Sequence, residues 1–256
     1  SPNQTVSELM DRRFVALNAM EDQEMAIRVF KDYDRASLPV VNEEGILLGI
    51  VTFDDIMDVV EEESTEDFLK FGSLQKPIID PLKAPAFTLY KERIFWLVAL
   101  LFVNIFSGAV LSNFEHVIQS VVSLVFFLPL IIDSAGNAGS QTASLMIRSL
   151  ATGDVHLKDW YKLVGKEFIV SFLLGITMAL GIAAIAKFRS PEIIYIVALT
   201  MILVVMIGSL VGLLLPFIFT KLKLDPATAS APLITSIADI LGIVIYFSLA
   251  SYFLGF

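Results

Sequence analysis

The sequence contains no cysteine, which excludes disulfides and thiolate metal sites. It has no P-loop pattern, and no nucleophile, base and orienting group stand out together, so an enzyme is not expected. The two histidines, His116 and His156, fall in expected loops and carry no evident function. No signal peptide is visible, and the sequence opens with Ser1-Pro2 rather than Met. We therefore expect a fragment that lacks the N-terminal part of a longer protein.

Charge is distributed unevenly along the 256 residues. Residues 1–92 carry 19 Asp+Glu and 9 Lys+Arg, a balance of −10, whereas residues 93–256 carry 8 and 9, a balance of +1; together these give −9. The whole chain is 56% hydrophobic, with a mean hydropathy of +0.75. This pattern predicts an acidic soluble module followed by a nearly neutral membrane module. An acidic module suits cations and does not suit nucleic acid.

Five apolar stretches are each long enough to cross ~30 Å of hydrocarbon. We expect them at residues 93–113, 117–147, 166–187, 192–219 and 229–254. The alternative, buried helices of a soluble core, is disfavoured by their length and low charge. The predicted fold class is a mostly α membrane protein, with five helices in the lipid bilayer after a small α/β motif and a connecting segment.

Lysine and arginine residues are concentrated on one side of these spans, and this asymmetry predicts the orientation in the membrane. Only Lys187 and Arg189 lie on the other side. The richer side holds Lys91, Arg93, Arg148, Lys158, Lys162, Lys166, Lys221 and Lys223. We therefore expect a multi-pass protein of the cell inner membrane with its N-terminus in the cytoplasm and its C-terminus outside.

The first ~70 residues have the pattern of a small α/β unit. Asp22 is a candidate N-cap for a helix that ends at about Tyr33. The other expected elements are a short strand at Phe14–Leu17, two buried strands at residues 38–41 and 46–52 joined by a turn at 42–45, and a helix from about Asp54 to Glu63.

Asp239 is the single charged residue in the apolar run Ala229–Phe256. A carboxylate within a membrane span costs roughly 2.5–3.5 kcal/mol on insertion scales, so it usually has a function. Thr235 and Ala231 lie one and two turns earlier on the same helical face. The alternatives are a structural Asp239 that caps a broken helix or bonds a neighbouring one, and a Thr235 hydroxyl that bonds its own helix.

Two interrupted segments are expected. The first is Leu224–Asp239, which mixes helix breakers with small and hydroxyl residues. The second is Pro129–Gln141, where Asp133 and Gly136 lie among small residues. Irregular backbone at membrane depth persists only where it is buried in protein or lines a watery cavity. Two such segments, each with an acidic residue, indicate a cation pathway. Asp133 either faces this pathway or pairs structurally with Asn137 or Ser140, and Gly136 either exposes its backbone or serves helix packing.

An acidic run at residues 54–67 leads towards the first span. Asp54, Asp58 and Glu62 share one helix face, and Asp225 lies in a loop that could face them. These residues are candidates for a regulatory cation site. The alternative is an ordinary solvated helix face.

The N-terminal pattern resembles a CBS domain. It comprises Val6–Met10, residues 26–30, Leu38-Pro39-Val40-Val41 and residues 49–56. CBS motifs act in pairs, so the resemblance implies a partner motif upstream. Thr52 and Asp55 fit the Thr-x-x-Asp nucleotide pattern of such domains, which makes a nucleotide such as ATP a candidate ligand. The alternative is a CBS motif that binds nothing.

A CBS motif before five spans, with PLIIDSAGNAGSQ at 129–141 and DPATASAPLITSIAD at 225–239, resembles the MgtE family of magnesium transporters. In full-length family members an N-terminal helical domain and a first CBS motif come earlier. The resemblance divides this chain into a CBS motif at 1–70, a linker or connecting helix at 71–92 and a transmembrane domain at 93–256.

The same resemblance implies a homodimer with a pore on its two-fold axis. Asp239 would face the pore, with Thr235, the backbone oxygen of Ala231, Asp133 and the carbonyls near Gly136 beside it. Ala231 departs from family members that carry Asn at this position, so only its carbonyl remains as a ligand.

The resemblance further implies a Mg²⁺-selective channel for uptake, closed by cytoplasmic Mg²⁺ bound at acidic residues. The implied sensing residues are Asp54, Asp58, Glu62 and Asp225. Two alternatives remain open. One is an ion-coupled exchanger with Asp239 and Asp133 as a proton or Na⁺ relay. The other is a CBS-bearing membrane sensor that transports nothing.

Overall fold

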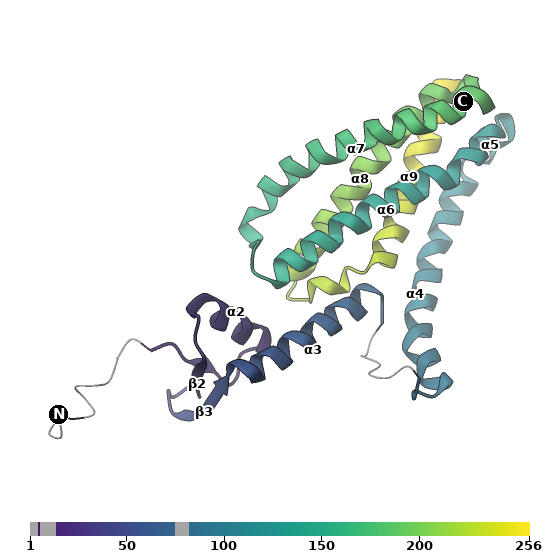
Figure 1. The fold of residues 1–256 in the computed structure, drawn as a ribbon. Coiled ribbons are helices and arrows are strands. Elements are labelled where there is room, and N and C mark those ends of the chain that lie inside the picture. The colour runs from purple at the N-terminus through teal and green to yellow at the C-terminus, as the bar shows by residue number, and fades with distance from the viewer. Residues whose placement is uncertain (1–4, 6–13, 75–81) are drawn as a thin grey trace. The chain divides into compact units, whose positions relative to one another are not determined.

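The computed structural model describes residue 5 and residues 14–74 and 82–256. Val6–Met10 of the CBS pattern and residues 75–81 of the expected linker lie outside the described residues. The chain divides into two compact units between Thr65 and Glu66 (Figure 1).

The first unit contains a three-stranded sheet in the order β1-β2-β3. β1 (Leu17–Asn18) pairs parallel to β2 (Ser37–Val41), which pairs antiparallel to β3 (Leu47–Thr52). α2 (Gln23–Tyr33) connects β1 to β2, and its N-cap is Asp22, as predicted. The Asp22 carboxylate accepts a hydrogen bond of 3.0 Å from the backbone N–H of Glu24, which satisfies one free donor of the first turn.

Two expectations about these strands are wrong. The first strand covers Leu17–Asn18 rather than Phe14–Leu17. β3 was expected to be buried, but Leu47, Leu48 and Ile50 are 62%, 60% and 67% exposed. A continuous apolar run is typical of a strand covered on both faces. β3 instead lies at an edge of the sheet, and in the described part of the chain only its Val51 packs against the small core of this unit.

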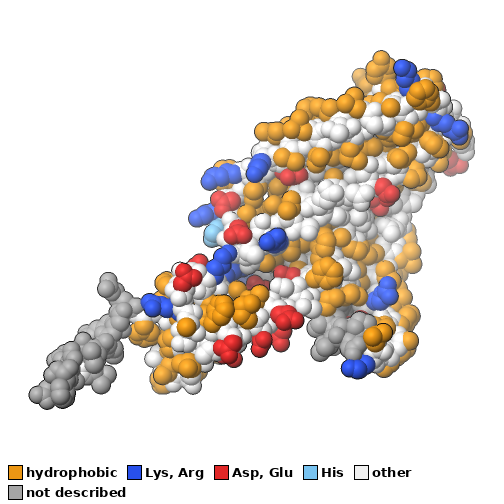
Figure 2. Space-filling view, in the orientation of Figure 1, with side chains coloured by type: hydrophobic (Ala, Val, Ile, Leu, Met, Phe, Trp, Pro, Cys, Tyr) orange, Lys and Arg blue, Asp and Glu red, His pale blue; other side chains and the backbone are white. Residues whose placement is uncertain are grey.

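α3 (Phe53–Phe71) is longer than the expected helix, which ended at about Glu63. The residues after Glu63 favour helix, and Glu66 and Lys70 form an ion pair at the i,i+4 spacing that stabilises it. The acidic run is therefore carried on one continuous helix. Figure 2 shows acidic side chains gathered along α3.

The second unit is helical, and the expectation of five spans is confirmed. Five helices among the described residues are long and apolar enough to cross a membrane. They are α4 (Ala86–Ser112), α6 (Ser123–Ala151), α7 (Trp160–Arg189), α8 (Ile194–Lys221) and α9 (Ala231–Leu254). Shorter pieces lie between them: α5 (Glu115–Ser120) and the 3₁₀ turns η1 (Leu157–Asp159), η2 (Pro191–Ile193) and η3 (Pro226–Thr228).

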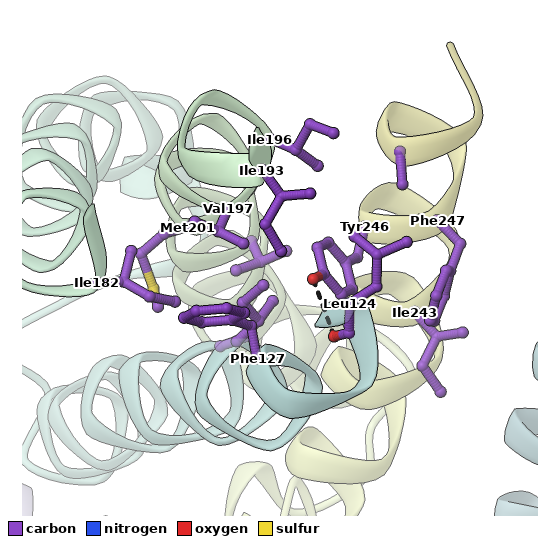
Figure 3. Close-up of a cluster of buried hydrophobic side chains, with 14 of the residues drawn as sticks. Leu124, Phe127, Ile182, Ile193, Ile196, Val197, Met201, Ile243, Tyr246 and Phe247 are labelled. Carbon is purple, nitrogen blue, oxygen red and sulfur yellow. Dashed lines mark hydrogen bonds between the residues drawn. The ribbon is translucent and has the colours of Figure 1, made fainter. Parts of the chain in front are cut away.

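α8 lies at the centre of this unit, where it packs against α6, α7 and α9 (Figure 1). A buried core joins these helices near one end. There the Tyr246 hydroxyl of α9 donates a hydrogen bond of 3.0 Å to the backbone carbonyl of Leu124 in α6, beside Phe127 (Figure 3). α4 packs mainly against α9 and leaves most of its apolar surface exposed, as expected for a helix that faces lipid.

The expected interruption at Pro129–Gln141 is absent, because α6 runs unbroken through it. Glycines such as Gly136 and Gly139 weaken an isolated helix, but here they allow close contact between helices, which compensates in a membrane. The other expected interruption, at Leu224–Asp239, is confirmed only as far as Ser230, because α9 is a continuous helix from Ala231 through Asp239. There the chain forms the short turn η3 and then an extended Ser230 before α9 begins at Ala231.

Candidate cation pathway

The residues proposed for a cation pathway meet where α6 contacts α9. A Cβ atom built on Gly136 would lie 3.0 Å from Cγ2 and 3.3 Å from Cβ of Thr235. The absence of a side chain at Gly136 therefore lets α9 approach α6 at this level. Asp133 precedes Gly136 by three residues, and Asp239 follows Thr235 by four, so each carboxylate lies about one turn from the contact on its own helix.

Asp133 and Asp239 thus lie on two adjacent spans, near the same contact between α6 and α9. Asp133 is exposed in the single chain, and Asp239 is half-buried. Within the described ranges, neither carboxylate forms a hydrogen bond or an ion pair. In particular, no hydrogen bond joins Asp133 to Asn137 or to Ser140, its alternative partners. Two unneutralised carboxylates on adjacent spans are an arrangement that suits a cation as ligand.

Thr235 and Ala231 contribute less specific chemistry. The Thr235 hydroxyl donates a hydrogen bond of 3.0 Å to the carbonyl of Pro232, within its own helix. This is the local alternative considered from the sequence, although the hydroxyl oxygen keeps lone pairs for a ligand. Ala231 is the first residue of α9. The preceding Ser230 is buried, and its hydroxyl has no partner in the part of the chain that the structure describes.

The predicted regulatory acids Asp54, Asp58 and Glu62 are exposed on α3. No group of three or more His, Cys, Asp or Glu residues that could hold a metal ion occurs among the described residues. The acidic run of one chain therefore presents a charged surface rather than a formed metal site.

Asp225 has two interactions that the sequence did not predict. One carboxylate oxygen accepts a hydrogen bond of 2.8 Å from the backbone N–H of Ala227 and so caps η3. The other lies 2.5 Å from Nζ of Lys70, near the end of α3. Lys70 also pairs with Glu66. Burial acts to lower the pKa of Lys70, but the hydrogen bonds and charges of Asp225 and Glu66 outweigh it and raise the pKa.

Sequence reasoning missed Lys70, although it lies among the acidic residues of α3. Its only local signal is the i,i+4 spacing to Glu66. Its second partner, Asp225, is 155 residues away in the sequence, and nothing in the local pattern points to it.

Thr52 and Asp55, the candidate nucleotide pair, are bonded to each other. The Thr52 hydroxyl donates a hydrogen bond of 2.5 Å to the Asp55 carboxylate, and the Thr52 backbone N–H donates one of 3.0 Å. These bonds lower the pKa of Asp55. The geometry is that of a capping arrangement at the start of α3. A cavity of about 420 Å³ in this unit is lined by residues of α2, of the segment between α2 and β2, and of α3, and neither Thr52 nor Asp55 is among them.

Comparison with known proteins places these features in a family. Residues 128–249 match the MgtE family model, described as a divalent cation transporter, and residues 6–62 match the CBS domain model. The chain belongs to the MgtE family. The matched segment contains the whole α6–α9 contact, including Asp133, Gly136, Thr235 and Asp239.

Relatives named "Magnesium transporter MgtE" are similar over nearly all of this chain. The Thermus thermophilus protein is 39% identical over 250 residues, which are 97% of this chain and 56% of that protein. The Bacillus subtilis protein is 38% identical over 99% of this chain and 56% of that protein. The Enterococcus faecalis protein is 30% identical over 98% and 55%. This MgtE-family chain thus spans about half the length of the curated relatives it matches.

Proposed function

We propose that this chain forms a Mg²⁺-selective channel for divalent cation uptake across the cell inner membrane. The observation that carries the proposal is the pair of unneutralised carboxylates, Asp133 and Asp239, on two adjacent membrane-spanning helices. The relatives named as magnesium transporters, at 38–39% identity, support Mg²⁺ as the cation.

A homodimer with the pore on its two-fold axis fits the exposure of Asp133. A charged side chain on a membrane-spanning helix is costly against lipid and is usually turned to a protein or water-filled interior. Asp133 is exposed in the single chain, so a second copy that covers this face would remove the cost. The axis would then gather two Asp133 and two Asp239 carboxylates around one ion path.

Such a site suits a hydrated ion. Mg²⁺ prefers near-octahedral oxygen coordination and loses its waters reluctantly. Carboxylates that hold the ion through its waters would select it without stripping it. Moving two charges through an inside-negative potential releases about 4.6 kcal/mol per 100 mV, so uptake needs no coupling ion.

Uptake driven by voltage requires a means of closure. We propose that cytoplasmic Mg²⁺ at Asp54, Asp58 and Glu62 provides it, with the cytoplasmic N-terminus and external C-terminus that the Lys/Arg asymmetry favours. The bond between Lys70 and Asp225 would connect the end of α3 to η3, directly before the pore helix α9.

The deciding experiment is Mg²⁺ flux into proteoliposomes under an imposed voltage. Asp239→Ala should abolish or severely reduce flux, whereas Glu115→Ala, which removes a carboxylate outside the five spans, should not. Wild-type flux in Asp239→Ala would exclude the pore assignment. Flux that requires a proton or Na⁺ gradient at fixed voltage would favour the exchanger, and no flux from any variant or parent would favour the sensor.

A further inference from the structure

A cavity of about 420 Å³ opens between the beginning of α7 and the end of α8. Its size is within the range of small-molecule sites. Its lining combines apolar side chains of α8 with two lysines and an aromatic ring. The main lining residues are Lys158, Trp160, Leu214, Phe217, Ile218 and Lys221.

No acidic residue that the structure describes pairs with either of these lysines. Lys158 of η1 and Lys221 at the end of α8 are exposed, and neither forms an ion pair with any residue in the described ranges. The acid nearest to Lys158 in the sequence, Asp159, has a carboxylate oxygen 3.8 Å from Nζ of Lys162 and accepts a 3.2 Å hydrogen bond from the backbone N–H of His156. The acid nearest to Lys221, Asp225, pairs with Lys70. Both ammonium groups at the cavity are therefore available to an anion.

The cavity lies at the level where two membrane spans end. α7 begins at Trp160 and α8 ends at Lys221, and both helices are candidate spans. Trp160 and Tyr161 are about half-exposed, and Nζ of Lys162 lies 5.8 Å from the Tyr161 ring centroid. Aromatic rings next to lysines are typical of the boundary between hydrocarbon and lipid headgroups.

We propose that this cavity binds an anionic phospholipid. The lipid phosphate would lie between Lys158 and Lys221, and an acyl chain would cover Leu214, Phe217 and Ile218. Basic pockets between transmembrane helices are a recognised setting for anionic headgroups. Inorganic phosphate would satisfy the two lysines but would leave the apolar wall in water, so the lining favours the lipid.

Trp160 provides a direct probe, because the chain has two tryptophans. In a Trp96→Phe background, Trp160 is the only tryptophan. The full chain would be reconstituted with phosphatidylglycerol or phosphatidylcholine brominated on the acyl chain. Brominated phosphatidylglycerol should quench Trp160 at a lower mole fraction than brominated phosphatidylcholine. Equal quenching by the two lipids in this parent would overturn the proposal without any lysine variant.

Lysine variants then test the headgroup contact. Lys158→Gln with Lys221→Gln should reduce the preference by roughly five-fold for each lysine removed. The matched control, Lys166→Gln with Lys223→Gln, makes the same charge change on the same side of the membrane at residues that do not line the cavity, and should keep the preference. An equal loss in both double variants would assign the effect to general surface charge. Millimolar inorganic phosphate should leave the preference intact, and its loss would assign the cavity to free phosphate instead.

Discussion

Gly212 of α8 lies directly against the backbone of Gly139 of α6. A Cβ atom on Gly212 would lie 2.0 Å from the carbonyl oxygen of Gly139, and a Cβ on Gly139 would lie 2.7 Å from the carbonyl oxygen of Gly208. The two helices are therefore in backbone contact over more than a turn. Because a backbone cannot move aside as a side chain can, this contact fixes the position of α6, the helix that carries Asp133.

Gly212→Ala should therefore destabilise the transmembrane domain by about 1–3 kcal/mol, the usual cost of overpacking. Gly181→Ala in α7 is the matched control, because a Cβ there has no neighbour within 4 Å. It should leave stability unchanged or raise it by up to about 1 kcal/mol through better helix propensity. Thermal unfolding in detergent measures both. Equal melting temperatures would mean that α6 and α8 are farther apart than the structure places them.

Asp133→Asn tests the contribution of the second carboxylate. If Asp133 lines the ion path, the change should lower the affinity for the permeating ion without abolishing flux, because Asp239 remains. Flux measured against external Mg²⁺ gives the affinity, and thermal unfolding gives the stability. Reduced stability with unchanged affinity in the surviving protein would assign Asp133 a structural role instead.

Thr142 and Glu167 connect α6 to α7. The buried Thr142 hydroxyl donates a hydrogen bond of 2.9 Å to the Glu167 carboxylate. Thr142→Val keeps the side-chain shape but removes this bond to a charged group, which should cost about 1.5–3 kcal/mol. Thr177→Val is the control, because the exposed Thr177 hydroxyl donates its hydrogen bond to the carbonyl of Leu173 in its own helix. Similar melting temperatures for the two variants would show that the bond between helices contributes little.

The sequence predicted the features that depend on local pattern. Five spans follow from hydropathy over about 20 residues, and the start of α2 follows from Asp22 as a capping residue. The continuity of α6 could not be predicted in this way. Glycines at 136 and 139 favour a break when the segment is taken alone, whereas close contact with α8 and α9 stabilises the helix. The exposure of β3 likewise depends on which neighbours cover it.

In the candidate site, too, the sequence predicted single residues but not the contacts between helices. Asp133 and Asp239 could be predicted because a charged residue within an apolar run can be recognised from the sequence alone. That Gly136 meets Thr235 depends on how α6 and α9 pack. The partner of Asp225 was equally invisible, because Lys70 belongs to a segment 155 residues away.

Lys70 and Asp225 also allow a test of the proposed gating. Asp225→Asn and Lys70→Gln both break the bond between α3 and η3, so each should shift inhibition by cytoplasmic Mg²⁺ to a higher concentration. The double variant should add little, because both changes remove the same interaction. Asp58→Asn with Glu62→Gln removes charge from α3 but keeps the bond between Lys70 and Asp225. Its shift in Mg²⁺ inhibition should therefore add to the shift caused by Asp225→Asn or by Lys70→Gln. Channel current recorded against cytoplasmic Mg²⁺ measures each curve.

The pH dependence of this bond has a definite sign. The pKa of Lys70 is raised in the folded protein. The stabilisation is therefore fully present below the ordinary lysine value of about 10.4 and is lost only as pH rises through the raised value. The Lys70 side chain is still 29% exposed to solvent, so screening reduces this contribution. The titration of Lys70 should therefore cause no difference in inhibition by cytoplasmic Mg²⁺ between about pH 6 and about pH 8.

A combined Asp58→Asn, Glu62→Gln and Asp225→Asn variant tests the acidic run as a whole. If cytoplasmic Mg²⁺ closes the channel through these residues, the variant should need a higher Mg²⁺ concentration for inhibition than the parent. Identical inhibition curves for the two proteins would mean that the acidic run is only a solvated helix face.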